Sequence, residues 1–177
     1  ETASMRRKGR GAGVQPRTNN PADSRAAVGR RLVAKLREAA SRGAKFVVFP
    51  ELAFTTCFPR YWYEDQAEVD RKFFEASMPS PETQTLFDEA KKHGIGFYIG
   101  YGELTMEEGR PRHFNTAILV SPEGKIVGKY RKIHLPGHAD HKKSAAFQHL
   151  EKKYFEVGNL GFRTFRFMDM IAGMLIC

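Results

Sequence analysis

The sequence predicts an α/β domain built on a mixed sheet, and two observations carry the prediction. An amphipathic helical pattern precedes the unalternated apolar run 44–49, which is typical of a strand covered on both faces. Two later strand patterns flank Ser-Pro-Glu-Gly at 121–124, a sequence that favours a hairpin turn. Helix-strand order early and a hairpin late together indicate helices layered on a sheet with both parallel and antiparallel pairs.

The first half of the chain divides into helices and strands at clear punctuation. Asp23 and Ser24 form a helix start, and Gly43 ends that helix before the strand 44–49. The aromatic stretch 54–62 contains a proline and is expected to be a loop. Residues 64–75 form a weak helix candidate. A further helix is expected from Ser80-Pro81 to Gly94, with a strand over 95–104 after it.

The second half is mainly extended, with one long connection. The expected strands are 113–120, 125–130, 162–167 and 171–177. Residues 133–158 are polar and contain four histidines, and a connection of this length in a compact domain is usually functional. A short helix is expected within it, over 147–155.

Length, charge and cysteine usage exclude several classes of protein. A chain of 177 residues predicts one domain, and no apolar stretch reaches the ~20 residues of a membrane span. No hydrophobic region follows the basic start, so a secretory signal is not supported. Cys57 and Cys177 do not make a disulfide framework, which favours a reducing, cytoplasmic setting.

The net charge of +9 is concentrated at the start of the chain. Residues 1–31 carry eight arginine and lysine side chains against two acids. Residues 1–22 are rich in Gly, Arg, Asn and Pro and are expected to form a basic, disordered tail, with the domain over 23–177. Aromatic residues are not interleaved with these basic ones, so nucleic-acid binding is disfavoured.

Three predicted strands end on residues that together suggest catalysis. Glu51 ends the first strand, Lys132 follows a basic cluster at the end of another, and Cys177 ends the last apolar run. A thiol nucleophile needs a base to take its proton and a cation or donor to stabilise the developing oxyanion. Taken singly, each residue is as well explained as a surface carboxylate, a solvated lysine or a core thiol; their joint placement favours a site.

The same segments resemble motifs of the nitrilase, or carbon–nitrogen hydrolase, superfamily. The stretch 41–56 around Phe-Val-Val-Phe-Pro-Glu is similar to the glutamate motif, and 114–120 with 124–137 is similar to the lysine motif. The stretch 147–158 most resembles the N-carbamoyl-D-amino-acid hydrolases. The resemblance implies an α-β-β-α sandwich, truncated here after the nucleophile strand, with Glu51, Lys132 and Cys177 as base, oxyanion stabiliser and nucleophile.

The resemblance also implies supporting residues and partners. Glu151 would be a second active-site carboxylate, and His134 and His149 would support the pocket through hydrogen bonds. It implies no cofactor and no metal, a small-molecule N-carbamoyl substrate, and a homo-oligomer in the full-length protein. The spacing of His138, His141 and His149 leaves a zinc site open as an alternative, disfavoured because no cysteine pair accompanies it. Cys57 is expected to be a packing residue.

The chain departs from the family pattern at both ends. Residues 6–17 are too charged and Gly-rich to supply the family's opening apolar strand, and no residue follows Cys177 to complete the oxyanion hole. The substrate-gripping arginines of the family would also lie beyond Cys177. The isolated chain is therefore expected to be poorly soluble and nearly inactive.

The leading interpretation is hydrolysis of the carbamoyl C–N bond of N-carbamoyl-D-amino acids to the amino acid, ammonia and carbon dioxide. Another amidase of the superfamily, acting on an N-carbamoyl amine or a β-ureido acid, is the first alternative. A non-catalytic fragment that acts only by association is the second. A basic nucleic-acid-binding protein is the third and the least supported.

Overall fold

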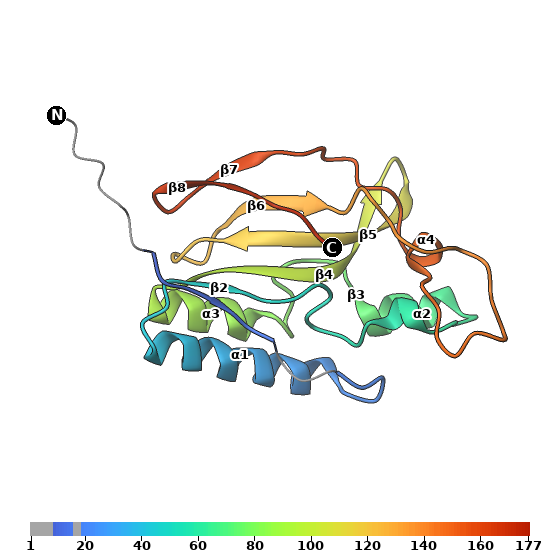
Figure 1. Cartoon of the computed structure of the whole chain (residues 1–177), viewed down its shortest axis with the longest axis horizontal. Helices are drawn as coiled ribbons and strands as arrows, with labels where there is room; N and C mark the ends of the chain where they lie inside the picture. Colours follow the sequence, from blue (N-terminus) through green and yellow to red (C-terminus); the bar gives the residue numbers. More distant parts are fainter. Residues whose placement is uncertain (1–8, 16–18) are drawn as a thin grey trace.

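A computed structural model describes residues 9–15 and 19–177 and shows a six-stranded mixed sheet with a separate two-stranded hairpin (Figure 1). Strands run in the order β1-β2-β4-β5-β6, and β3 pairs with the second part of β4. The pairs β1–β2, β2–β4 and β3–β4 are parallel, whereas β4–β5 and β5–β6 are antiparallel. The bounds are β1 Gly11–Gly13, β2 Phe46–Val48, β3 Phe74–Glu75, β4 Gly96–Glu107, β5 Arg110–Val120 and β6 Ile126–Arg131.

Two helices cover one face of this sheet. The helices α1 (Arg25–Ser41) and α3 (Gln84–His93) lie side by side below the strands in Figure 1. Their buried side chains pack against alternate residues of β4 and β5, including Phe97, Ile99 and Ile118. We call this side the helix face. Its alternate positions continue to Tyr101, Glu103 and Thr116, because residues opposite one another in β4 and β5 point the same way.

The other face of the sheet carries the end of the chain. The strands β7 (Thr164–Phe167) and β8 (Met170–Gly173) form an antiparallel hairpin that packs over Ala117, Leu119 and Tyr130. In Figure 1 this hairpin lies above the sheet, opposite α1 and α3. We call this side the hairpin face. It also carries Tyr98, Gly100 and Asn115 by the alternation of the strands.

The remaining short helices lie beside the second half of β4. They are the 3₁₀ helix η1 (Phe58–Arg60), α2 (Gln66–Phe73) and α4 (Glu151–Tyr154). A cluster of aromatic rings holds them together: Phe58 stacks on Phe73 with ring centroids 4.7 Å apart and meets Tyr154 edge-on at 5.4 Å. This cluster fixes α4 against η1.

Local signals explain the helix boundaries well. Ser24 caps α1 by accepting from the amide N–H of Ala27, and Gly43 follows the helix with φ of 78°, as its predicted role requires. Gly94 ends α3 in the left-handed region, also as predicted. The expected proline start of that helix is wrong, because Pro81 lies in a turn and α3 begins after Thr83.

The prediction of a disordered tail over residues 1–22 is wrong for the part that the structure describes. Strand β1 extends the sheet along β2, with Lys45 donating to the Arg10 carbonyl at 2.8 Å and Val14 donating to the Val48 carbonyl at 2.9 Å. Asn19 donates from Nδ2 to the Thr55 carbonyl at 2.9 Å. Backbone pairing needs no apolar side chains, which is why composition did not reveal it. Residues 1–8 and 16–18 lie outside the described residues.

The prediction of a buried last strand over 171–177 is also wrong. Strand β8 pairs with β7 and stops at Gly173, and Ile171 and Leu175 are 63% and 68% exposed. Met168 with φ of 52° makes the tight connection after β7, so the apolar run pairs locally with β7. Within the described residues, no helix combines the length and hydrophobicity needed to cross a membrane.

Candidate active site

Glu51 follows β2 at a point where the backbone lies directly on β4. Gly100 makes this approach possible: a Cβ at that position would stand 2.9 Å from Cα of Glu51 and 3.0 Å from the amide nitrogen of Leu52. Two hydrogen bonds hold the crossing, from Gly100 to the Pro50 carbonyl at 3.3 Å and from Ala53 to the Gly100 carbonyl at 2.9 Å. The Glu51 carboxylate is thereby fixed on the hairpin face.

Lys132 is the residue that directly follows β6, and its backbone pairing with β5 places it on the same face. Its amide N–H donates to the carbonyl of Asn115 in β5 at 2.8 Å, which continues the strand pairing by one residue. Its carbonyl accepts from Gly158 at 2.9 Å. A Cβ at Gly158 would lie 2.0 Å from the Arg131 carbonyl oxygen, so glycine lets the segment after α4 pack on this backbone.

These two side chains meet in a polar cluster with Glu151 and Asn115. Lys132 Nζ lies 2.8 Å from Glu51 Oε1 and 2.9 Å from Glu151 Oε1, and its side chain is only 4% exposed. Asn115 Nδ2 donates to the same Glu51 Oε1 at 2.6 Å. We call these four residues the carboxylate cluster. It confirms the expected approach of Glu51 to Lys132.

Glu151 enters the carboxylate cluster as the first residue of α4. The helix is held against η1 by the Leu150 N–H, which donates to the Pro59 carbonyl at 2.8 Å. Glu151 Oε2 and Asn115 Oδ1 are both buried and have no hydrogen-bond partner among the described residues. The expected position of Glu151 beside Lys132 is thus observed, with one oxygen on the ammonium.

The surroundings of the carboxylate cluster raise the pKa values of both Lys132 and Glu151, for different reasons. Burial alone would lower the pKa of Lys132, but hydrogen bonds to Glu51 and Glu151 outweigh it and raise that pKa, so the ammonium stays charged. Burial raises the pKa of Glu151, the Lys132 hydrogen bond opposes this, and the charge of Glu51 adds to the rise. Glu151 therefore holds a proton more readily than an ordinary glutamate.

Cys177 lies beyond the carboxylate cluster, at the end of the segment that follows β8. Tyr98 Oη donates to the Leu175 carbonyl at 2.7 Å, which places this segment on the hairpin face, close to the strand that carries Gly100. The Cys177 thiol is free and exposed, and no hydrogen bond to Glu51 or Lys132 is seen among the described residues. Of the three residues expected to meet, Glu51 and Lys132 are seen in direct contact, and a contact of Cys177 with either is not seen among the described residues.

A second thiol lies nearer the carboxylate cluster than the sequence suggested. Cys57 is exposed, so the expectation that it is a packing residue is wrong. Neighbouring groups nevertheless desolvate its thiol in part, and this desolvation and the charge of Glu51 raise the pKa of Cys57; Glu151 adds to the rise and Lys132 opposes it. In the sequence, its position six residues after Glu51 and just before η1 could have indicated that it lies near Glu51.

The two histidines expected to support the pocket have other partners. His134 is exposed and stacks on Phe162 with centroids 6.1 Å apart. His149 is exposed, meets Phe147 edge-on at 5.5 Å, and accepts at its carbonyl from His138. Neither donates to or accepts from the carboxylate cluster in the described part of the chain, so the expected hydrogen bonds are not seen.

Ring stacking and a cation–π contact hold part of the histidine-rich connection. His141 stacks on Trp62 at 4.4 Å with an interplanar angle of 3°, and Lys153 Nζ lies 4.2 Å from the same ring centroid. In residues 9–15 and 19–177, no three His, Cys, Asp or Glu side chains are arranged to hold a metal ion.

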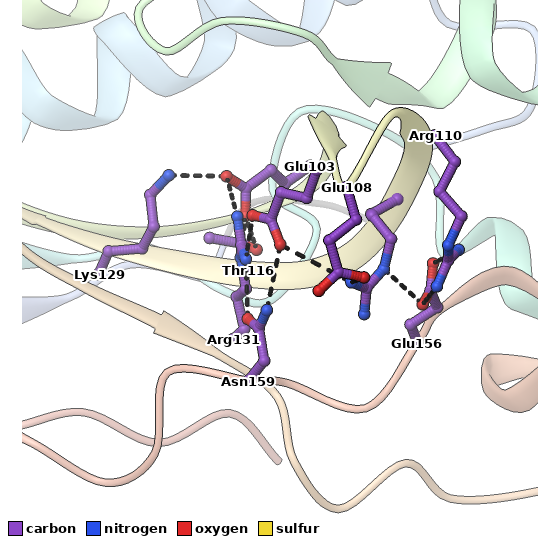
Figure 2. A network of polar contacts seen from close by, with 10 residues as sticks. Glu103, Glu108, Arg110, Thr116, Lys129, Arg131, Glu156 and Asn159 are labelled. Atoms are coloured by element: carbon purple, nitrogen blue, oxygen red, sulfur yellow. Dashed lines mark hydrogen bonds and ion pairs between the residues drawn. The ribbon is translucent and has the colours of Figure 1, made fainter.

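A separate ionic network lies on the helix face, behind the carboxylate cluster. Glu103 is buried and accepts from Thr116 Oγ1 at 2.7 Å, Lys129 Nζ at 2.6 Å and Arg131 Nε at 2.8 Å (Figure 2). Arg131 also donates to Glu107 at 2.7 Å and to Asn159 at 2.8 Å. Thr116 and Arg131 are the sequence neighbours of Asn115 and Lys132, so β5 and β6 serve one cluster on each face.

Comparison with known proteins identifies relatives for most of the chain. The chain is 38% identical to a nitrilase of Pyrococcus abyssi over 145 residues, which is 80% of this chain and 46% of the relative. It is 27% identical to the N-carbamoylputrescine amidase of Arabidopsis thaliana over 180 residues, covering 100% of this chain and 53% of that protein. The chain thus spans about half the length of the curated relatives it matches.

Solved structures share the fold. An amidase from Nesterenkonia sp. superposes with a TM-score of 0.68 at 19% identity, over 96% of this chain and 55% of that one. This similarity supports the nitrilase-like α/β architecture expected from the sequence. The family model for carbon-nitrogen hydrolases matches residues 12–177, a range that contains Glu51, Lys132, Glu151 and Cys177. The chain belongs to the carbon-nitrogen hydrolase family.

Proposed function

We propose that this chain supplies the thiol, base and ammonium of an enzyme that hydrolyses the carbamoyl C–N bond of N-carbamoyl amino acids, with the D-amino acid derivatives as its substrates. The observation that carries the proposal is the buried Lys132 ammonium between two carboxylates. A purely structural ion pair needs one carboxylate, whereas a second one with a raised pKa is typical of sites that move protons.

The proposed reaction assigns one task to each group. Glu51 takes the proton of the Cys177 thiol, and the sulfur attacks the carbamoyl carbon. Lys132 stabilises the oxyanion of the tetrahedral intermediate. The C–N bond breaks as Glu51 returns the proton to the departing nitrogen. Water then attacks the S-carbamoyl enzyme while Glu51 takes one of its protons, and the C–S bond breaks as Glu51 passes that proton to sulfur. The carbamic acid released decomposes to ammonia and carbon dioxide.

The charge of the surrounding connection supports an anionic substrate. Residues 134–153 carry four lysines and four histidines against Asp140 and Glu151. Lys153 and His141 are both held against Trp62, close to η1 and α4. A carboxylate-bearing N-carbamoyl amino acid is attracted to such a rim, whereas a positively charged amine is repelled.

An N-carbamoyl amine is the second candidate, and a β-ureido acid belongs to the same alternative class. The similarity to N-carbamoylputrescine amidases of Arabidopsis thaliana and Solanum lycopersicum, at 27% and 28% identity, favours the amine. Small-molecule hydrolysis in a cytoplasmic homo-oligomer is part of the same proposal, with no cofactor required by the chemistry above.

The test is ammonia release by the purified full-length protein from N-carbamoyl-D-alanine, N-carbamoyl-L-alanine and N-carbamoylputrescine, assayed in parallel. Preference for the D-amino acid derivative supports the proposal, whereas preference for the amine supports the second candidate. Cys177→Ala should abolish release, and Cys57→Ser should leave measurable turnover because that thiol is not the nucleophile. Full turnover by Cys177→Ala would refute the thiol mechanism.

A further inference from the structure

Two donors converge on a single oxygen of Glu51. Lys132 Nζ and Asn115 Nδ2 both reach Oε1, at 2.8 Å and 2.6 Å. The Glu51 side chain is 27% exposed, and no donor to its Oε2 is seen among the described residues. Both observed donors therefore go to one oxygen, and the other has none among the described residues.

Asn115 is held too firmly to be a chance partner. The residue is completely buried in the middle of β5, opposite Gly102 of β4. Its carbonyl accepts from the Lys132 N–H at 2.8 Å, so one residue fixes Lys132 through the main chain and Glu51 through the side chain. The amide orientation follows from the 2.6 Å contact, because the reverse orientation would place two acceptor oxygens together.

We propose that Asn115 is a positioning residue that holds Oε1 of Glu51, so that Oε2 is the atom that takes the proton from the thiol and returns it to the departing nitrogen. This inference rests on the proposed function. In the step, the S–H bond breaks and an O–H bond forms at Oε2. A carboxylate with one oxygen held presents its second oxygen in a single direction, which is the requirement for efficient proton transfer.

The other charged or titratable groups near Glu51 do not replace this role. Lys132 binds the same oxygen, and Glu151 carries a negative charge or a proton on the far side of Lys132. Burial and the charge of Glu51 raise the pKa values of Tyr98 and Cys57, and neither is seen to donate a hydrogen bond to Glu51 in the described residues. Asn115 is thus the uncharged donor that orients the carboxylate.

Two substitutions separate positioning from packing. Asn115→Leu keeps the volume and removes the donor; kcat should fall about 10- to 100-fold, the range of a hydrogen bond to a charged group, with little change in KM. Asn115→Asp keeps the shape, but its carboxyl donates to Glu51 only when protonated. Its kcat should therefore peak at a lower pH than that of the unaltered protein and fall as the pH rises further, because Glu51 must be ionised while the new carboxyl is protonated.

The matched control is Asn159→Asp. Asn159 Nδ2 also donates to a carboxylate, Glu107 Oε2 at 3.1 Å, but on the helix face and away from the carboxylate cluster. This variant should keep the pH profile of the unaltered protein. An unchanged pH profile for Asn115→Asp, or an effect of Asn115→Leu on KM alone, would overturn the inference. If Asn115→Leu does not fold by circular dichroism, the isosteric Asp variant decides.

A second measurement keeps this test independent of the substrate. In a Cys57→Ser background, the rate of Cys177 alkylation by iodoacetamide reports thiol deprotonation without any carbamoyl compound. Asn115→Leu should slow alkylation, and Asn159→Asp should not. If the unaltered protein hydrolyses none of the three substrates, the proposed function fails, while the alkylation rates still support or refute the role of Asn115.

Discussion

Replacing Glu103 by Gln should destabilise the domain strongly, because it removes the charge at the centre of the network on the helix face. The Glu103 side chain is 7% exposed and that of Arg131 is 5% exposed, so water does not compensate the change. Breaking a buried ion pair by removing one partner costs about 3–5 kcal/mol. Arg131 keeps Glu107 at 2.7 Å and Asn159 at 2.8 Å, which favours the lower end, about 3 kcal/mol.

That free energy converts to a measurable shift in thermal unfolding. A domain of this size loses about 2–4 °C in Tm per kcal/mol, so Glu103→Gln should lower Tm by about 6–12 °C. Differential scanning calorimetry at neutral pH measures it. A matched change at an exposed glutamate, Glu108→Gln, should move Tm by less than about 4 °C, because exposed ion pairs contribute about 0–1 kcal/mol.

The Tm values of the unaltered protein and of Glu103→Gln should approach each other in acid. Burial would raise the pKa of Glu103, but hydrogen bonds from Arg131, Lys129 and Thr116 outweigh it and hold that pKa below its usual range. A carboxyl with a lowered folded pKa stabilises the fold above its unfolded pKa of about 4.3, and this contribution is lost as the pH falls through the folded value. A Tm difference that stays constant into strong acid, or one below 2 °C at neutral pH, would refute the reasoning.

Two further substitutions test the carboxylate cluster. Lys132→Met leaves Glu51 and Glu151 facing each other without a cation, and ammonia release should fall at least about 10²-fold, as for loss of an oxyanion donor; activity within tenfold of normal would contradict this. Gly100→Ala places a Cβ 2.9 Å from Cα of Glu51 and should cost about 1–3 kcal/mol of stability as well as kcat. The control is Gly173→Ala, where an added Cβ meets nothing within 4 Å, and equal losses at both positions would argue against the crossing.

The sequence predicted those parts of the fold that local chemistry determines. The cap at Ser24 and the glycines after α1 and α3 were found because each has a specific backbone requirement. Strands β4 and β5 are longer than expected, because the charged residues between them looked like a loop. In the structure Glu107 and Arg112 lie in a continuous hairpin, where Arg112 pairs with Glu156 at 2.7 Å and Glu107 with Arg131.

The candidate site was predictable only in part, for a similar reason. Glu51 and Lys132 follow strands, and the ends of neighbouring strands meet, so their approach was foreseeable from order along the chain. Asn115 lies inside a strand and carries no charge, and its role depends on which face of the sheet it occupies. The position of Cys177 depends on the partner of the last strand, which hydrophobicity alone does not specify.

The alternation of side chains along β5 and β6 couples the register of these strands to the assembly of both polar clusters. Asn115 and Lys132 point to the carboxylate cluster, while their neighbours Thr116 and Arg131 point to Glu103 on the opposite side. A slip of one residue would exchange the two sets and bury a mismatched group on each face. The carboxylate cluster can therefore form only when the strands pair in the correct register. A copy with slipped strands would lack this cluster and should be inactive.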